Sequence, residues 1–436
     1  MSPQTIPLET IEHTLDFLRD DLRALAKCAL VCRALLPTCR THLYRDISLT
    51  HEVVDGKTVE TSRTKRFFQL VDADPDILLY VRALTLDYGQ DIFQSPPMGA
   101  RDAGRAWKYV LRRCFPSLRS LTLCYLTMSG LADLTAAITH FLPELESLSF
   151  RDLQVLEGPT DIGVPLSLIT PWSTDEWVAR GGAARSNLRA FSLVDLYNEV
   201  AALSKLVSLL GHYPQLDSLD IRPQMPLVDD LLSDPRHIIS EFAPRLRHFG
   251  LLLRDITGDG AIPPEERERM ERVLADLPQC RELRSLCVHY SCFSYYLSTM
   301  MAANPMLMPG EPPRPATPPQ LSPFFLDTLC DVLSSTPGAP FPLLEELAIV
   351  LHNPLTWLGS WADGLDRLAT LLVGERFPRF RRLEICASIS ALTRILYTDK
   401  GLEEARLQIR EVKEGFLRPI LKRFEEAGVE VDIKVT

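Results

Sequence analysis

A short pattern of apolar residues recurs along this 436-residue chain and constrains its fold more than any other feature. The pattern is apolar-x-x-apolar-x-apolar, and a clear copy is FPSLRSLTL from Phe115. Its last positions alternate, so Leu121 and Leu123 point to one side of the backbone and Thr122 to the other, which is the periodicity of a β-strand. A proline often stands just before the strand, where its missing N–H costs no ladder hydrogen bond. Further copies begin at Tyr80, Leu142, Ser186, Tyr213, Ala243, Cys280, Phe341 and Phe377.

Helical periodicity fills much of the sequence between these strands. In the stretch from Glu199 to Tyr213, apolar residues recur at three- and four-residue steps and so share one helical face. One strand and one helix per unit cannot bury their own apolar stripe, whereas stacked units cover each other. We therefore expect an α/β solenoid with parallel strands on the concave face and helices on the convex face.

The strand phrase with one helix per unit resembles the leucine-rich repeat family, and Leu118, Leu121 and Leu123 carry the resemblance in the clearest copy. Successive units are unevenly spaced, so the resemblance is to an irregular array with insertions between strands. The alternative fold is a doubly wound α/β domain. A single strand phrase that recurs in sequence order favours the solenoid.

The first 48 residues follow a different pattern, that of three short helices. Pro7 suits the first helical position, and Ile11, Leu15 and Leu18 follow on one stripe. Asp20 or Asp21 is suited to cap a second helix. A third helix is expected over residues 33–44. A bundle of this size buries too little apolar surface to be stable by itself. We therefore expect it either to be covered by a partner or to cap the first repeat unit.

This N-terminal segment resembles the F-box. The resemblance rests on Ile6-Pro7-Leu8-Glu9, on Leu30-Val31-Cys32-Arg33 and on the pair Leu43-Tyr44. An F-box followed by irregular leucine-rich repeats is similar to the F-box proteins of mushroom-forming fungi. The resemblance implies binding to the Skp adaptor of cullin-RING ubiquitin ligases. The residues expected to contact that adaptor are Ile6, Pro7, Leu8, Glu9, Ile11, Leu15, Leu22, Leu30, Val31 and Cys32.

The sequence thus predicts three regions: an F-box-like helical domain over residues 1–48, a helical linker or cap over 49–79, and a leucine-rich-repeat-like domain over 80–436. A proline-rich insertion, residues 303–323, interrupts the last of these.

Composition narrows the classes of partner and compartment. A net charge of −10 argues against a general nucleic-acid surface or an anionic-membrane surface. No basic and apolar leader opens the chain, and no apolar run approaches the ~20 residues that span a bilayer. The scattered cysteines are then expected to be free thiols. We expect a cytoplasmic or nuclear protein that is a monomer outside its complex.

Few residues suggest chemistry. Cys280, Cys287, His289 and Cys292 have the ligand types of a zinc site but lack paired C-x2-C spacing, so no metal or other cofactor is expected. No phosphate-binding glycine loop, H-E-x-x-H or G-x-S-x-G motif occurs, so we do not expect an enzyme.

The sequence therefore favours a substrate-recognition adaptor of a Skp-cullin-F-box E3 ubiquitin ligase, whose repeats bind an unknown target protein. The alternative is a leucine-rich-repeat scaffold without a ligase connection. Outward-facing strand residues are the candidate target contacts: Ser120, Thr122, Ser147, Ser149, Asp220, Arg222, His248, His289 and Glu384.

Overall fold

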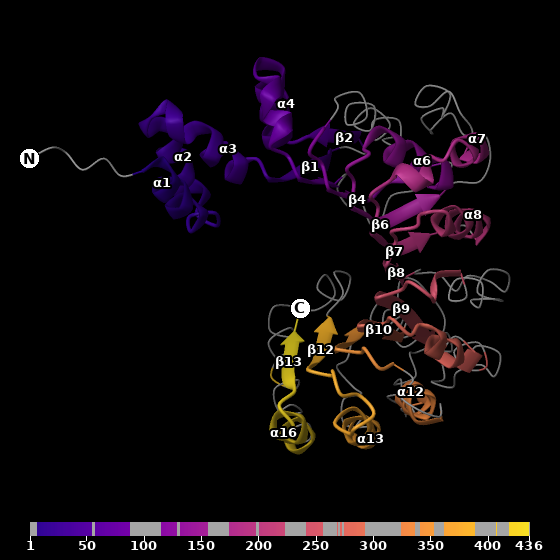
Figure 1. Cartoon of the computed structure of the whole chain (residues 1–436). Helices are drawn as coiled ribbons and strands as arrows, with labels where there is room; N and C mark the ends of the chain where they lie inside the picture. Colours follow the sequence, from indigo (N-terminus) through magenta and orange to yellow (C-terminus); the bar gives the residue numbers. More distant parts are fainter. Residues whose placement is uncertain are drawn as a thin grey trace, which may run out of the picture. The chain divides into compact units, whose positions relative to one another are not determined.

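The protein is a mixed α/β structure whose strands are mostly parallel (Figure 1). The computed structural model describes residues 7–54, 57–87, 115–128, 131–155, 174–197, 200–222, 241–255, 268, 271–272, 274–292, 324–335, 341–352, 362–388, 407 and 418–435. The chain divides into two compact units, unit 1 (Met1–Leu216) and unit 2 (Asp217–Thr436). The division falls inside the region predicted as one repeat domain.

The sheet of unit 1 is parallel except at one edge. Its parallel strands run in chain order, and β5 (Thr127–Met128) adds a short pairing to β6. At the edge, β2 (Lys57–Glu60) lies antiparallel to β1. The parallel strands are β1 (Asp46–Val54), β3 (Ala83–Asp87), β4 (Ser120–Cys124), β6 (Ser147–Val155) and β7 (Ala190–Tyr197).

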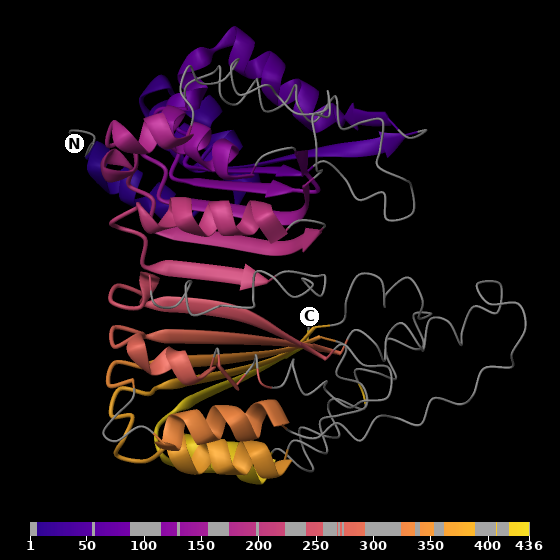
Figure 2. The same cartoon turned by 90° about the vertical axis from the view of Figure 1, so that its right-hand side faces the viewer.

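Unit 2 has a sheet of the same kind, with all its strands parallel and in chain order. Neighbouring strands lie side by side and run in the same direction (Figure 2). The strands are β8 (Ser218–Arg222), β9 (His248–Asp255), β10 (Ser285–Cys292), β11 (Glu346–His352), β12 (Arg382–Ser388) and β13 (Glu430–Val435).

The recurring apolar pattern produces the core of both sheets. In unit 1 the register places Leu84, Leu121, Leu148 and Phe191 side by side, and all are buried. In unit 2, Leu219 begins an equivalent buried row that continues through Phe249, Leu286, Leu347 and Leu383. The alternation predicted from the sequence is confirmed. In β3, β4 and β8 the apolar residues of the pattern are buried, and the residues between them are half-buried on the other face.

Helices cover one side of each sheet. In unit 1 these include α6 (Leu131–Phe141), α7 (Thr174–Ala179) and α8 (Val200–Gly211). In unit 2, α12 (Phe324–Ser335), α13 (Ala362–Leu372) and α16 (Arg418–Glu426) lie together on one side of the strands (Figure 1). Short 3-10 turns precede several strands, including η4 (Ala183–Arg185) and η5 (Leu277–Gln279).

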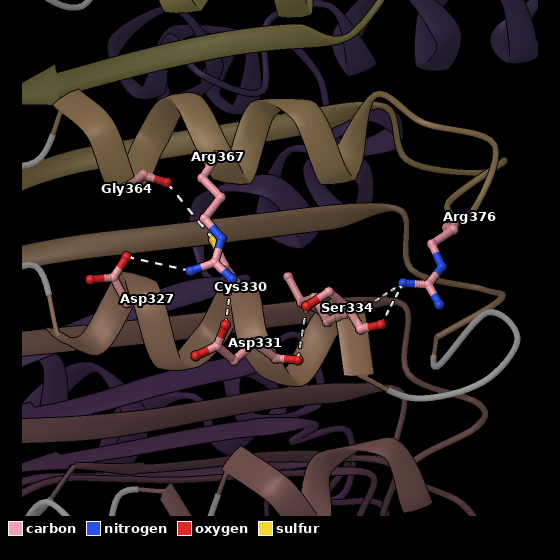
Figure 3. Close-up of polar contacts among 8 residues, drawn as sticks. Asp327, Cys330, Asp331, Ser334, Gly364, Arg367 and Arg376 are labelled. Carbon is pink, nitrogen blue, oxygen red and sulfur yellow. Dashed lines mark hydrogen bonds and ion pairs between the residues drawn. The ribbon is translucent and has the colours of Figure 1, made fainter.

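Arginines link neighbouring helices of unit 2. Arg367 on α13 forms ion pairs with Asp331 and, at 3.7 Å, with Asp327, both on α12 (Figure 3). Arg376 donates to the carbonyl of Ser334 at 2.7 Å, which satisfies an orphan carbonyl at the end of α12. Ion pairs and a hydrogen bond therefore connect α12 to α13 and to the turn that follows it, in addition to the packing of the helices on the sheet.

The N-terminal residues of unit 1 form three α-helices. α1 (Leu8–Asp16), α2 (Leu22–Val31) and α3 (Leu36–Leu43) are joined by short turns, including η1 (Arg33–Leu35). Asp21 caps α2, because its carboxylate accepts a hydrogen bond from the Ala24 N–H at 2.9 Å, as the sequence predicted. A core joins the helices and consists of Leu15, Leu25, Leu35 and Cys39, with Ile11, Leu18, Cys28, Ala29 and Leu43 packed against it.

The segment predicted as a helical linker, residues 49–79, is only partly helical. Its first part belongs to the hairpin of β1 and β2, and only α4 (Ser62–Ala73) and the turn η2 (Pro75–Leu79) are helical. The prediction missed β1 because its apolar alternation, Ile47 and Leu49, is short and follows the third helix directly. The proline-rich insertion, residues 303–323, lies outside the described residues.

Among the residues that the structure describes, no helix combines the length and the apolar character needed to cross a bilayer.

A buried hydrogen bond in unit 1 offers a test of this packing. The Tyr213 hydroxyl lies 2.7 Å from the Thr139 Oγ1 on α6, and the Thr139 hydroxyl donates to the Thr135 carbonyl at 2.9 Å. The two hydroxyl groups share this buried bond, and burial raises the pKa of the Tyr213 phenol, which keeps it protonated.

We expect Tyr213→Phe to lower the free energy of unfolding by about 1 kcal/mol, because one buried hydrogen bond is lost while the ring still fills its site. Urea denaturation measures this change. The double variant Tyr213→Phe with Thr139→Val should be less destabilised than the sum of the two single variants. Strict additivity would contradict a direct bond between the two hydroxyls.

Candidate functional site

Two kinds of surface are candidates for function, namely the outer surface of the N-terminal helices and the outward faces of the two sheets. On the N-terminal helices, four large apolar side chains are exposed: Phe17 (76%), Leu22 (52%), Leu30 (88%) and Val31 (75%). We call these four residues the exposed apolar set. The rest of the described chain exposes only four more large apolar residues, so the density at residues 17–31 is unusual.

Helix geometry explains why Leu30 and Val31 are exposed. Leu25 is the buried core residue of α2. At 3.6 residues per turn, Leu30 lies about 140° around the helix from Leu25, and Val31 lies about 120° from it in the other direction. Both side chains therefore face away from the bundle core, and nothing in the bundle buries them.

The residues predicted to contact an adaptor fall into two groups. Leu15 is 3% exposed and belongs to the bundle core, so it is not available to a partner in this structure, whereas Ile11 is half-buried and packs against that core. Pro7, Glu9, Leu22, Leu30, Val31 and Cys32 are exposed. Ile6 and the side chain of Leu8 lie outside the described residues.

Sequence reasoning missed Phe17. This residue is the C-cap of α1, outside the stripe formed by Ile11, Leu15 and Leu18, and its ring packs edge-on against His13. An aromatic residue off the apolar stripe of an amphipathic helix was the available signal.

Polar contacts connect α3 to α1 and to the rest of unit 1. On α3, Thr38 donates to the Glu12 carboxylate at 3.0 Å, and the His42 Nε2 lies 3.0 Å from an Asp16 oxygen. Arg40 pairs with Asp74, the residue that ends α4, at 2.8 Å. The bundle is thus connected to the helix that follows the first hairpin of unit 1.

The outward face of the unit 1 sheet carries a row of hydroxyl groups. The register of the parallel strands places five hydroxyl residues at neighbouring positions: Ser48, Thr85, Thr122, Ser149 and Ser192. Two of the predicted target contacts, Thr122 and Ser149, belong to this row, and two others, Ser120 and Ser147, form part of the row beside it. All four are half-buried.

The outward face of unit 2 carries paired charges instead. Arg222 binds the Asp220 carboxylate through two of its nitrogens, and the Nε contact is 2.7 Å. Glu384 accepts from Lys434 at 3.1 Å and from Arg382 at 3.2 Å. Hydrogen bonds to Asp432 and Glu384 raise the pKa of Lys434. The predicted contacts Asp220, Arg222 and Glu384 are therefore engaged with neighbours in the same sheet.

Two predicted contacts of unit 2 differ sharply in accessibility. His248 is exposed, whereas His289 is 3% exposed and lies 3.1 Å from the Cys287 sulfur. Burial raises the pKa of the Cys287 thiol to about 12, so this thiol is protonated at neutral pH and is a poor nucleophile. In the described part of the chain, no group of three or more His, Cys, Asp or Glu is arranged to hold a metal ion.

A comparison with family models finds no match to this chain, and a comparison with curated proteins finds none either.

Gly250 is required by the ion pair beside it. A Cβ at this position would lie 2.8 Å from the Cγ of Asp220, closer than real Cβ contacts. We expect Gly250→Ala to displace Asp220 and to cost about 1–3 kcal/mol of stability.

A double-variant cycle tests this contact by urea denaturation. Adding Asp220→Ala should offset much of the Gly250→Ala loss, because the clashing carboxylate is then absent. Gly374→Ala is the matched control, since its Cβ would meet only ordinary contacts beginning at 3.4 Å. Equal losses for Gly250→Ala and Gly374→Ala would contradict the steric explanation.

Proposed function

We propose that this chain is a substrate-recognition adaptor of a Skp-cullin-F-box E3 ubiquitin ligase. In this proposal the N-terminal helices are an F-box that binds the Skp adaptor, and the strand-helix units bind a target protein as an irregular leucine-rich repeat. The chain's contribution is proximity, because it holds the target near the ubiquitin-carrying enzyme. It would act in the cytoplasm or the nucleus.

The exposed apolar set is the observation that carries the proposal. Phe17, Leu22, Leu30 and Val31 are exposed on a bundle whose own core is small. Fully burying one such side chain in an interface contributes ~1.5–3 kcal/mol. A partner that buried these side chains would therefore gain binding free energy from each of them.

The second candidate is a repeat-based scaffold without a ligase connection. The ion pair between Arg40 and Asp74 favours it, because it joins α3 to the helix after the first hairpin. In this alternative the N-terminal helices cap the open edge of the unit 1 sheet, as the terminal units of repeat arrays must.

Co-purification with a purified Skp adaptor tests the proposal. We expect Leu30→Asp with Val31→Asp to abolish retention of the adaptor, because two carboxylates would be buried in the interface. Both side chains are exposed, so the bundle itself should keep its thermal unfolding midpoint. Leu15→Asp is unsuitable, since Leu15 lies in the core and its replacement would unfold the helices.

The matched control is Leu70→Asp with Leu79→Asp. These leucines are 39% and 52% exposed and lie on α4 and η2, outside the bundle. The control should retain the adaptor as wild type does. If wild-type protein fails to retain it, or if both double variants retain it equally, the ligase connection is refuted and the scaffold is favoured.

A further inference from the structure

A row of arginines lines one end of the unit 1 sheet. The residue immediately before β3 is Arg82, and the equivalent positions before β1, β4 and β7 are Arg45, Arg119 and Arg189. Glu146 occupies the position before β6. All four arginines are exposed. We call these five residues the rim row.

Backbone hydrogen bonds place the members of the rim row side by side. The Arg82 N–H donates to the Arg45 carbonyl at 2.9 Å, and the Arg119 N–H donates to the Arg82 carbonyl at 2.8 Å. The same bonds continue from Glu146 to Arg119 and from Arg189 to Glu146. Since neighbouring strands lie about 4.8 Å apart, the row extends about 19 Å along the rim.

The rim row carries an excess of positive charge, because it contains four arginines and one glutamate. Only Arg119 has an acidic partner in the row, Glu146 at 3.3 Å, and no ion pair joins Arg45, Arg82 or Arg189 to any residue that the structure describes. Arg45, Arg82 and Arg119 occupy three neighbouring positions, an arrangement in which like charges repel. The other carboxylates close in sequence to the rim are Asp46 and Glu144.

Unit 2 provides an internal comparison at the same structural position. Its rim begins with Asp217, Arg247, Arg284, Glu345 and Arg381, and the equivalent backbone bonds connect them. Each of these three arginines forms an ion pair with a carboxylate of the same row. Arg247 pairs with Asp217 at 3.6 Å. Arg284, at 3.8 Å, and Arg381 both pair with Glu345. The position tolerates alternating charges, so the uncompensated arginines of unit 1 are not imposed by the fold.

We propose that the rim row of unit 1 binds an acidic segment of a partner protein, whose carboxylates lie across Arg45, Arg82, Arg119 and Arg189. Building on the function proposed above, this segment belongs to the target protein. Arginine suits the role because its guanidinium binds carboxylates through two donors. A polyphosphate is less suited, because Glu146 lies within the row and the chain as a whole has a net charge of −10.

Binding of a defined acidic peptide to the full chain provides the test. The probe is a fluorescein-labelled peptide of alternating glutamate and serine, long enough to span the row, and its glutamine counterpart is the uncharged control. Fluorescence anisotropy at low ionic strength should show binding of the glutamate peptide only, and added salt should weaken that binding.

The rim variant is Arg82→Glu with Arg189→Glu, and we expect it to weaken binding of the glutamate peptide about tenfold. The matched control is Arg281→Glu with Arg379→Glu, which makes the same charge change at exposed arginines of unit 2 and should weaken binding less than about twofold. Circular dichroism checks that both variants are folded.

Several outcomes would overturn the assignment: equal effects of the two double variants, equal binding of the glutamate and glutamine peptides, or tighter rim-dependent binding of a single-stranded oligonucleotide. The Skp co-purification separates this result from the ligase connection. If the rim variant still binds both the Skp adaptor and the glutamate peptide, only the acidic-segment site is refuted. If the wild-type chain binds the peptide through the rim row but retains no Skp adaptor, only the ligase connection is refuted.

Discussion

The structure depends on a backbone ladder that begins at the rim of each sheet. Rim carbonyls accept hydrogen bonds from two successive N–H groups at the start of the next parallel strand, as the Arg45 carbonyl does from Arg82 and Ala83. This contact sets the register of every later pair in the parallel strands, and a shift by one residue would turn the leucines outward. Because Leu84 and Leu121 must both be buried, the register and the apolar core reinforce each other.

The same register decides what each unit can present to a partner. Outward positions do not contribute to the leucine core, so they are free to differ between units. In unit 1 they align hydroxyl groups, whereas in unit 2 they align acids with bases that neutralise each other, such as Glu384 with Lys434. The two faces therefore differ in chemistry although their backbones are built alike.

The N-terminal helices show which structural features an amphipathic sequence pattern predicts and which it does not. Their sequence predicted the stripe of Ile11, Leu15 and Leu18 and the cap at Asp21, because both are local properties of a helix. It did not separate Leu15, which lies in the core, from Leu30, which is exposed, because both are leucines of short helices whose packing partners the sequence does not specify. The packing of α2 against α1 and α3 makes that distinction, and it determines which residues a partner can reach.

The sequence by itself located the strands that carry the recurring apolar pattern and showed which of their residues face the core, since alternation between residues such as Leu121 and Thr122 is a property of one strand alone. It also located helices such as α8 from their three- and four-residue periodicity. It did not locate β1 and β2. Only the tertiary structure decided that Arg45, Arg82 and Arg119 are neighbours and that Asp220 lies over Gly250. The physical reason is that these contacts form between strands separated by long and uneven stretches of chain, and local periodicity contains no information about them.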